Sequence, residues 1–414
     1  MCEAAVAVGI DLGTTSIKVC AIDSSETVVE EKSAVHDAWI QNDSPDRKEQ
    51  CAEKIFAKVI ELLQSMRPNL KSVKNIVITG QMHGIILWNN DSLVAGEFSC
   101  SPLITWMDSR VPQQFIDSLP KWEYGDVHAG YGIVTLAWLY RNSLLDPKWN
   151  CCGTNEIVPL DILPKIVPNG TIVGIVRHNG FGLPTNAMVY ASLGDLQATV
   201  YPLLTNDSAV LNLGTSAQLC FRYNGDHRKF LKDHLLFEPF FDDFKLITAA
   251  SMNGGNAVHL LAEKILEWAS ALSVDHIISD RLTLDFEKFE QILNSSSKQS
   301  SLINVEPTFY EERSEHLPSV ISGLRSDTSI AELLHATAKG VIANLNRLLS
   351  TEILHSNGIT RLILAGNANK EPYSTYIKEI FKDFEICASD QSKASAAYGA
   401  ALFASRMPVL PKSE

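Results

Sequence analysis

The chain has 414 residues, a formal net charge of −13 and a hydrophobic fraction of 45%. This length suggests two or three globular domains, and the acidic balance provides no basic footprint for nucleic acid or an anionic membrane. The eight cysteines are scattered and form no Cys-x-x-Cys pair, which favours a reducing, cytoplasmic compartment over a zinc knuckle or a disulfide framework. The first residues do not resemble a signal peptide, and no apolar run is long enough for a membrane span.

The first motif lies in residues 6–23, VAVGIDLGTTSIKVCAID, where two β-rich apolar runs flank a Gly-Thr turn. This pattern predicts a β-hairpin whose turn offers backbone N–H groups and hydroxyls to an anion. An ordinary polar hairpin is the alternative. The residues with a predicted role are Gly13 for close approach, Thr14, Thr15 and Ser16 as hydroxyl donors, Lys18 as a point charge for a phosphate, and Asp11 as a ligand of Mg²⁺ through water.

Residues 51–65 have helical spacing, and residues 75–80, NIVITG, predict a short buried strand that ends at a glycine. Two loops follow, TGQMHG at 79–84 and ITWMDSR at 104–110. Loops at strand ends are where α/β proteins bind ligands. We expect Gln81 and His83 to bind sugar hydroxyls and Met82 and Trp106 to cover an apolar face, although a single histidine is more often structural.

Residues 192–197, SLGDLQ, place Asp195 after an apolar run and before a helical stretch. A carboxylate at such a strand end suits the general base of a phosphoryl transfer. Aspartate is also a common helix N-cap, and this motif alone favours the cap.

A second Gly-Thr turn lies in residues 208–223, SAVLNLGTSAQLCFRY. Asp11–Ser16 aligns with Asn212–Ala217, with three identical positions and three conservative changes. The two copies lie about 200 residues apart and predict two domains of similar plan. Because the motif occurs twice, we favour a phosphate clamp over an ordinary hairpin, with Gly214 and Thr215 in the second copy.

Strands and helices continue to alternate in the second half, which predicts an α/β architecture. Residues 258–272 and 330–350 have helical patterns, 360–366 predicts a strand, and 394–405 predicts a small-residue helix. The Gly-rich turns MNGGN at 252–256 and LAGNAN at 364–369 could admit an adenine or ribose to close backbone contact.

Together these motifs resemble the FGGY carbohydrate kinases, from about residue 6 to residue 405. The GDLQA, LNLGTSAQL and AASMNGGN forms favour the members that act on the seven-carbon ketose sedoheptulose, while GQMHG is shared with xylulose kinases. The resemblance implies a two-domain actin/hexokinase-like (RNase H-like) fold with mixed sheets and a central ligand cleft. It implies a sugar-binding domain at 1–198, shortened near 146–161, and an ATP-binding domain at 199–406.

The resemblance also implies Mg-ATP as cosubstrate and a ketose as acceptor, with oligomeric state left open. It implies that Asp195 is the catalytic base, and this replaces the helix N-cap role that the local motif alone favoured. Family sugar contacts fall on Met82, His83, Asp195 and Leu196. Family nucleotide contacts fall on Gly13, Thr14, Thr15, Lys18, Gly214, Thr215, Gly254, Gly366 and Asn367.

Two departures from the family pattern concern the nucleotide side. The adenine-site glycine cluster is thinned to Leu364-Ala365-Gly366, and Glu311 replaces the glycine that usually precedes Glu-Arg.

A third departure is larger. After the predicted helix within 126–145, the family has several tens of further residues, but here Asp146–Asn150 leads almost directly to residues 162–174. The chain is either a compact enzyme or a shortened product, and we favour the second because removing elements from a packed layer exposes apolar surface. The alternatives to a sedoheptulose kinase are a xylulose-type pentulose kinase and a catalytically weak sugar- or nucleotide-binding protein.

Overall fold

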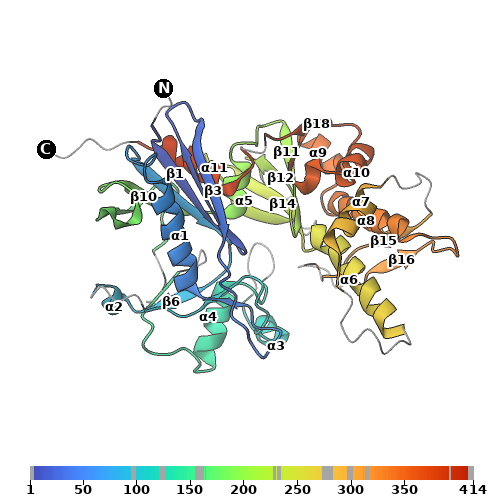
Figure 1. Ribbon diagram of the computed structural model, residues 1–414, viewed down its shortest axis with the longest axis horizontal. Helices are drawn as coiled ribbons and strands as arrows, with labels where there is room; N and C mark the ends of the chain where they lie inside the picture. The colour runs from blue at the N-terminus through green and yellow to red at the C-terminus, as the bar shows by residue number, and fades with distance from the viewer. Residues whose placement is uncertain are drawn as a thin grey trace. The chain divides into compact units, whose positions relative to one another are not determined.

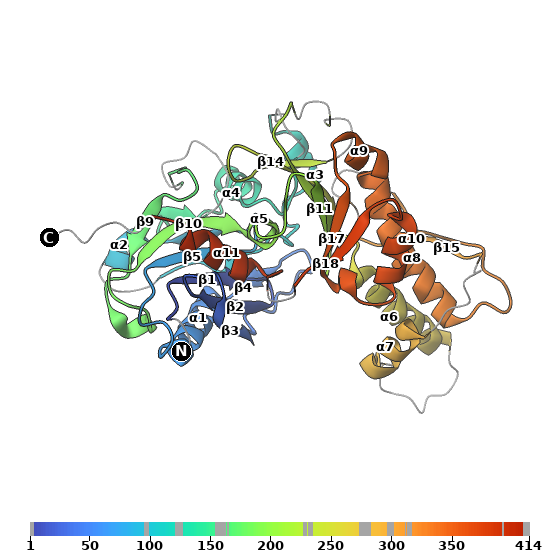
Figure 2. The same cartoon turned by 90° about the horizontal axis from the view of Figure 1, so that it is seen from above.

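The computed structural model describes residues 4–94, 99–120, 127–153, 163, 165–226, 230, 235–272, 283–295, 302–310, 312, 317–390 and 393–408. The chain forms two compact units, one of Met1–Pro202 with Ser392–Glu414 and one of Leu203–Gln391 (Figures 1 and 2). The sequence placed residues up to 406 in the second domain, whereas the contacts group the last segment with the first unit, because its helix packs on the first unit's sheet.

The first unit is built on a six-stranded sheet of order β3-β2-β1-β5-β10-β9. Strand β1 pairs antiparallel with β2 and parallel with β5, and β5 pairs parallel with β10. The predicted hairpin and the predicted strand at 75–80 are therefore confirmed. The strands are β1 (Ala7–Leu12), β2 (Ser16–Ile22), β3 (Val28–Val35), β5 (Asn75–Gly80), β9 (Ile172–Ile175) and β10 (Met188–Gly194).

Helices cover both faces of this sheet. Helix α1 (Ala52–Met66) packs on the face that carries Val8 and Ile10, where it contributes Ile55 and Leu62 to the core. Side chains alternate along a strand, so Gly9 points to the other face, where α11 (Ala396–Ser405) lies against β1.

Short elements carry the loops of the first unit. The two-residue strands β4 (Glu49–Gln50) and β7 (Leu103–Ile104) pair with each other, which brings the segment before α1 beside the 104–110 loop. The predicted helix within 126–145 is α4 (Gly132–Arg141). The others are β6 (Ile86–Trp88), β8 (Cys151–Gly153), α2 (Asn90–Val94), α3 (Gln113–Asp117), η1 (Asn179–Phe181) and α5 (Asp195–Val200).

The second unit has a six-stranded sheet of order β13-β14-β12-β11-β17-β18. Its strands are β11 (Ser208–Leu213), β12 (Ala217–Tyr223), β13 (Leu236–Pro239), β14 (Lys245–Ser251), β17 (Arg361–Gly366) and β18 (Glu385–Ala388). Its helices are α6 (Gly255–Leu272), α7 (Phe286–Asn294), α8 (Ile330–Leu348), α9 (Thr351–Ser356), α10 (Tyr373–Ile380) and η3 (Asn367–Asn369), and a small sheet joins β15 (Asn304–Glu306) to β16 (Val320–Ser322).

The predicted internal repeat is visible in the pairing of the strands. Strand β11 is antiparallel to β12 and parallel to β17, which is parallel to β18. Strand β1 has the same relations with β2, β5 and β10. Each Gly-Thr turn thus closes the central hairpin of its own sheet.

Candidate functional site

The turn between β1 and β2 is held from outside by two buried side chains. Nε2 of His36 lies 3.2 Å from the Gly13 carbonyl oxygen, and Nε2 of Gln50 donates to the Thr14 carbonyl oxygen at 2.7 Å. A Cβ on Gly13 would lie 2.9 Å from the Ser16 carbonyl oxygen. The turn therefore needs glycine at this position and has a fixed shape.

Asp11 and Asp195 form a carboxylate pair within the first unit. Asp11 lies near the carboxyl end of β1, and Asp195 is the first residue of α5, directly after β10. Burial, and next the charge of Asp195, raise the pKa of Asp11 to about 7, while the charge of Lys18 opposes this rise. The N-cap of α5 is Gly194, so Asp195 does not serve as the cap that its motif alone favoured; its Oδ1 accepts from the Leu196 N–H at 2.8 Å.

Several buried acceptors near this pair have no hydrogen-bond partner. They are Asp11 Oδ1, Thr79 Oγ1, Gln81 Oε1 and Gln197 Oε1. Thr79 is paired in register with Asp11, Gln81 follows β5, and Gln197 is in α5. Buried polar atoms are ordinarily satisfied, so this cluster indicates that a polar ligand, ordered water or a cation occupies the site.

The donor set around Asp11 is compatible with a magnesium ion held through water. Carboxylate oxygens are suitable ligands, and Mg²⁺ in proteins usually keeps several waters. Within the described residues, no group of three or more His, Cys, Asp and Glu side chains is arranged to hold a metal. The pair of carboxylates, with the unpartnered Oδ1 of Asp11, offers suitable oxygen donors for such an ion, and the magnesium role of Asp11 stays a prediction.

The predicted sugar loop after β5 lies beside this carboxylate pair. The Sδ of Met82 would be 2.7 Å from a Cβ on Gly194, the residue before Asp195. His83 has a positive φ of 62° and its ring stacks on Tyr131 with centroids 4.3 Å apart. The loop thus has a defined shape that packs against the start of α5.

Trp106 and Gln81 are both connected to the β1–β2 turn. Nε1 of Trp106 donates to Thr14 Oγ1 at 3.1 Å. Nε2 of Gln81 donates to Gln50 Oε1 at 3.0 Å, and Gln50 in turn holds the Thr14 carbonyl. Gln50 is fully buried, and the sequence analysis missed it because no local pattern distinguishes a bridging glutamine.

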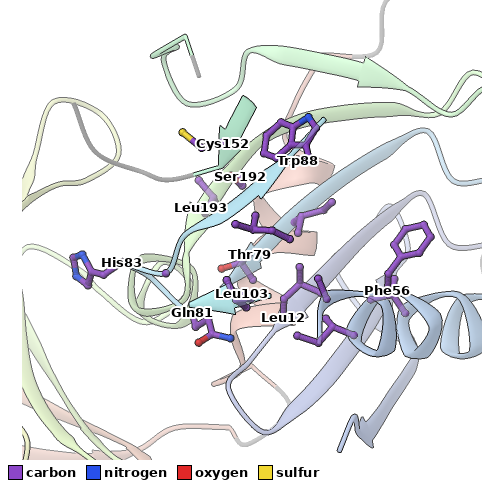
Figure 3. Close-up of a pocket in the computed structure, with 17 residues that line it drawn as sticks. Leu12, Phe56, Thr79, Gln81, His83, Trp88, Leu103, Cys152, Ser192 and Leu193 are labelled. Atoms are coloured by element: carbon purple, nitrogen blue, oxygen red, sulfur yellow. The ribbon is translucent and has the colours of Figure 1, made fainter. Parts of the chain in front are cut away.

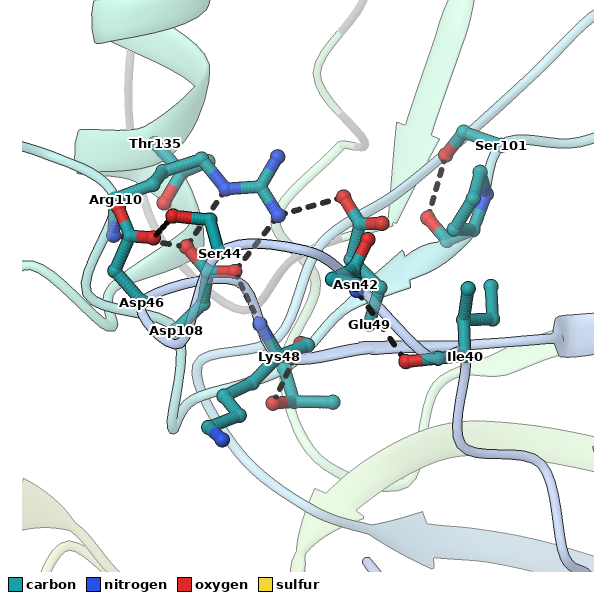
Figure 4. Close-up of polar contacts among 12 residues, drawn as sticks. Ile40, Asn42, Ser44, Asp46, Lys48, Glu49, Ser101, Asp108, Arg110 and Thr135 are labelled. Carbon is teal, nitrogen blue, oxygen red and sulfur yellow. Dashed lines mark hydrogen bonds and ion pairs between the residues drawn. The ribbon is translucent and has the colours of Figure 1, made fainter.

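A buried ion cluster fixes the 104–110 loop (Figure 4). The Arg110 guanidinium donates to both oxygens of Asp108 at 2.7 Å and to Glu49 Oε1 at 2.6 Å. Asp108 is 1% exposed and also accepts from the Lys48 N–H at 2.8 Å. The cluster joins this loop to β4, and so it holds Trp106 and Gln50 in place.

The second Gly-Thr turn lies beside the MNGGN turn within the second unit. The Gly255 N–H donates to the Gly214 carbonyl at 3.0 Å, and a Cβ on Gly254 would lie 2.6 Å from the Thr215 carbonyl oxygen. Gly366 has a positive φ of 61°, and a Cβ added to it would lie 2.5 Å from the Leu213 carbonyl oxygen. Gly254 and Gly366 thus permit close backbone packing around the turn.

A cavity of about 740 Å³ opens beside this second turn. It is lined by Gly214, Thr215, Gly255, Asn256, His259, Phe289, Glu290, Leu293, Asn294, Tyr310, Asn367, Lys370, Glu371 and Tyr373. Of the predicted nucleotide residues in this unit, Gly214, Thr215 and Asn367 line the cavity, and Gly254 and Gly366 do not. Glu311, one of the departures from the family pattern, lies outside the described residues.

The first unit contains a different cavity, of about 500 Å³, over β5 and β10 (Figure 3). Phe56 and Val59 of α1, Leu193 of β10 and Trp88 of β6 contribute apolar walls, and Gln81 is also among its lining residues. His83, another predicted sugar contact, and the polar residues Thr79 and Ser192 also line it.

The remaining predicted residues of the first unit have other contacts. Nζ of Lys18 lies 3.5 Å from Glu31 Oε1, and the carbonyl of Thr15 accepts from the His36 N–H at 3.3 Å. None of the described helices is both long and apolar enough to cross a membrane.

Residues 6–142 match the profile of the FGGY family of carbohydrate kinases, N-terminal domain. The sedoheptulokinase of Mus musculus is 26% identical over 476 residues, covering 97% of this chain and 98% of that protein. This alignment is longer than the whole chain, so the mouse protein has residues that the chain lacks.

Solved structures show that the fold is shared. The xylulose kinase from Rhodospirillum rubrum superposes with a TM-score of 0.74 at 14% identity, covering 96% of this chain and 89% of that one. The Plasmodium falciparum glycerol kinase with ADP gives 0.72 at 17% identity, with 98% and 90% covered. The mixed sheets and flanking helices agree with the predicted actin/hexokinase-like architecture. As its motifs predicted, the chain is a carbohydrate kinase, and its residues 6–142 match the N-terminal domain of the FGGY family.

Proposed function

We propose that this kinase phosphorylates a ketose with ATP, and that the ketose is sedoheptulose, giving sedoheptulose 7-phosphate and ADP. The observation that carries the proposal is the Asp11–Asp195 pair with unpartnered buried acceptors around it. The similarity to a sedoheptulokinase over nearly the whole chain supports the seven-carbon substrate. A pentulose such as xylulose is the second candidate, supported by the structural likeness to a xylulose kinase.

In the proposed mechanism, Asp195 accepts the proton of the terminal ketose hydroxyl while that oxygen attacks the γ-phosphorus and ADP leaves. Gln81 and His83 bind sugar hydroxyls, and Met82 and Trp106 pack against the carbon chain. Leu196 contacts the sugar from α5. These residues orient the acceptor hydroxyl toward Asp195, and orientation supplies a large share of such rate accelerations.

Each Gly-Thr turn would bind phosphate with its own backbone N–H groups and hydroxyls, at Gly13, Thr14 and Thr15 in the first unit and at Gly214 and Thr215 in the second. Lys18 would add positive charge, and the cavity beside Asn367 would receive the nucleoside. Mg²⁺, held through water by ionised Asp11, would neutralise charge on the phosphates.

A catalytically weak binding protein remains the rival, because the first unit is shorter than in the family. The scattered cysteines of the sequence favour a reducing compartment, and we propose a cytoplasmic location.

The test is ADP release measured against a panel of ketoses of different length, with wild type and Asp195→Asn. We expect sedoheptulose to give the highest kcat/KM, and we expect Asp195→Asn to lower kcat by about 10²- to 10⁴-fold, the usual cost of losing a general base. The variant keeps the side-chain shape, so its melting temperature should stay near that of wild type. Near-normal turnover in Asp195→Asn would show that Asp195 is structural.

A further inference from the structure

A buried carboxylate in the second unit has no part in the mechanism above. Glu312 is 3% exposed, and it lies directly after the position where the sequence departs from the family pattern. Its Oε1 accepts from Ser251 Oγ at 2.6 Å, Asn344 Nδ2 at 2.9 Å and Asn253 Nδ2 at 3.0 Å. Its Oε2 accepts from the Met252 N–H at 3.0 Å. Four donors on one side chain are typical of an ionised carboxylate, which accepts and does not donate.

The donors come from the end of β14, the MNGGN turn and helix α8. Ser251 and Asn253 are almost completely buried, so their polar groups depend on protein partners. Asn253 also binds the backbone of Tyr310 with both ends of its amide, at 2.6 and 2.9 Å. Glu312 is therefore the common acceptor of two segments that are far apart in the sequence, residues 251–253 and helix α8.

The orientation of Asn344 is fixed from its other side. Arg347 donates to Asn344 Oδ1 from Nε at 3.1 Å and from Nη2 at 2.9 Å. With its oxygen engaged by two donors, the amide must turn its NH₂ group toward Glu312. The Asn344 NH₂ group of helix α8 is thus already oriented to donate to the Glu312 carboxylate.

The MNGGN turn connects Glu312 to the second Gly-Thr turn. After Met252 and Asn253, the next three residues contact the second Gly-Thr turn directly: Gly254 packs on its backbone, the Gly255 N–H donates to Gly214, and the Asn256 N–H donates to Thr215 at 3.3 Å. Gly214, Thr215, Gly255 and Asn256 all line the 740 Å³ cavity.

From these contacts we infer that Glu312 is a positioning residue for the nucleotide: it fixes the MNGGN turn so that the Gly214–Thr215 backbone is pre-shaped for phosphate. This inference rests on the proposed function, since it assigns the cavity to ATP. Preorganisation lowers the ordering cost of binding, so loss of the anchor should appear in nucleotide affinity rather than in ketose affinity.

Three variants test the inference. Glu312→Ala removes all four contacts. Glu312→Gln keeps one acceptor oxygen for Ser251, Asn253 and Asn344 but places an NH₂ group against the Met252 N–H. Val341→Ala is the matched control, because Val341 is fully buried on α8 and belongs to the hydrophobic core rather than to the polar cluster.

The readouts are ADP and ATP affinity by isothermal titration without sugar, the KM for ketose, and the melting temperature. We expect Glu312→Ala to weaken nucleotide binding by about 10-fold or more and Glu312→Gln by about 3-fold, since each unsatisfied buried donor is costly. The ketose KM should change less than 2-fold. Val341→Ala should lower the melting temperature and leave nucleotide affinity within about 2-fold of wild type.

The outcomes separate the inference from the proposed function. If wild type binds nucleotide and both Glu312 variants bind it equally well, the inference is overturned and the proposed function stands. Equal weakening by Val341→Ala would also overturn it, because general destabilisation would then explain the loss. If wild type binds neither ATP nor ADP, the proposed function fails and the inference falls with it. If Glu312→Ala does not fold, Glu312→Gln decides alone, since it retains three of the four contacts.

Discussion

Asp11 couples the stability of the first unit to pH. Its pKa is raised to about 7, first by burial and then by the charge of Asp195. A carboxyl with a raised pKa binds its proton more tightly in the folded state than in the unfolded state. Its contribution to stability is therefore fully present below its ordinary pKa of 3.8 and is lost as the pH rises through about 7.

We predict that Asp11→Asn is more stable than wild type at pH 8, by an amount on the order of a few kcal/mol in unfolding free energy, and similar to wild type at pH 4. Added Mg²⁺ should raise the melting temperature of wild type more at pH 8 than at pH 5, because it binds the ionised form, and should have little effect on the variant. Calorimetry across this pH range measures both effects. An identical pH profile in the two proteins would show that Asp11 does not titrate as described.

Gly214 offers a cleaner test of the phosphate clamp than Gly13. A Cβ on Gly214 would have only the Ser216 carbonyl oxygen within 4 Å, at 3.9 Å, so the protein itself has room for a side chain there. We predict that Gly214→Val folds normally and loses at least about 10-fold in affinity for a non-hydrolysable ATP analogue, because the branched side chain enters space that a phosphate needs.

Isothermal titration and a thermal melt together check the Gly214 prediction. Gly13→Val is a poor substitute, since its Cβ would lie 2.9 Å from backbone and would distort the turn. Unchanged nucleotide affinity in a folded Gly214→Val protein would remove this turn from the binding site.

At the scale of elements, helix α11 is composed of small residues because it approaches the sheet closely. A Cβ on Gly9 of β1 would lie 1.9 Å from the Ala397 carbonyl oxygen, and one on Gly399 would lie 1.8 Å from the Ala198 carbonyl oxygen of α5. The helix therefore packs on the strand that carries Asp11 and on the helix that begins with Asp195.

We predict that Gly9→Ala destabilises the first unit by about 1–3 kcal/mol, the usual cost of overpacking, and lowers kinase activity because β1 must shift. Gly174 on β9 is the matched control: no atom lies within 4 Å of its Cβ position, so Gly174→Ala should change stability by less than about 0.5 kcal/mol. Urea unfolding of both variants gives the comparison. Equal stability of the two variants would contradict the close approach of α11.

At the scale of the whole molecule, the two sheets share a plan but differ, within the described residues, in what lies over the corresponding parallel strands. Between the parallel strands β17 and β18 the chain forms α10, whose Tyr373 and Ile377 belong to the core of the second unit. Parallel strands are usually joined by such a helix. In the first unit, the counterparts β5 and β10 have an apolar cavity of about 500 Å³ above them.

The first unit also exposes apolar side chains at the edge of its sheet. Ile172, Val173 and Ile175 of strand β9 are 37%, 57% and 37% exposed. Exposed apolar edge strands favour association between chains. Together with the alignment to a longer relative, these surfaces support the hypothesis that the segment after Asp146 has been lost; residues 154–162 lie outside the described part of the chain.

We predict that the 414-residue chain binds ATP but phosphorylates ketoses poorly, and that inserting the corresponding segment of the mouse sedoheptulokinase after Asp146 raises ketose turnover and melting temperature together. Filling the cavity buries apolar surface, which contributes about 25 cal/mol per Å². ADP-release assays and thermal melts measure both quantities. Full activity and a cooperative melt in the unmodified chain would show that the segment is dispensable and that the compact form is complete.

The sequence by itself determined the local elements and the resemblance to carbohydrate kinases. The two Gly-Thr hairpins, the strands that end in glycine, the amphipathic helices and the small-residue helix were all predicted, because turn chemistry and hydrophobic periodicity are properties of neighbouring residues. Their order along the chain was enough to show the resemblance to the FGGY kinases.

Only the tertiary structure decided which of these residues meet. The coupling of Asp11 to Asp195, the bond from Trp106 to Thr14 and the bridge through Gln50 depend on the parallel pairing of β1, β5 and β10 and on the β4–β7 pair. Glu312 likewise meets donors from segments about 30 to 60 residues away. Long-range contacts of this kind are set by sheet register and helix packing, and no local pattern specifies them.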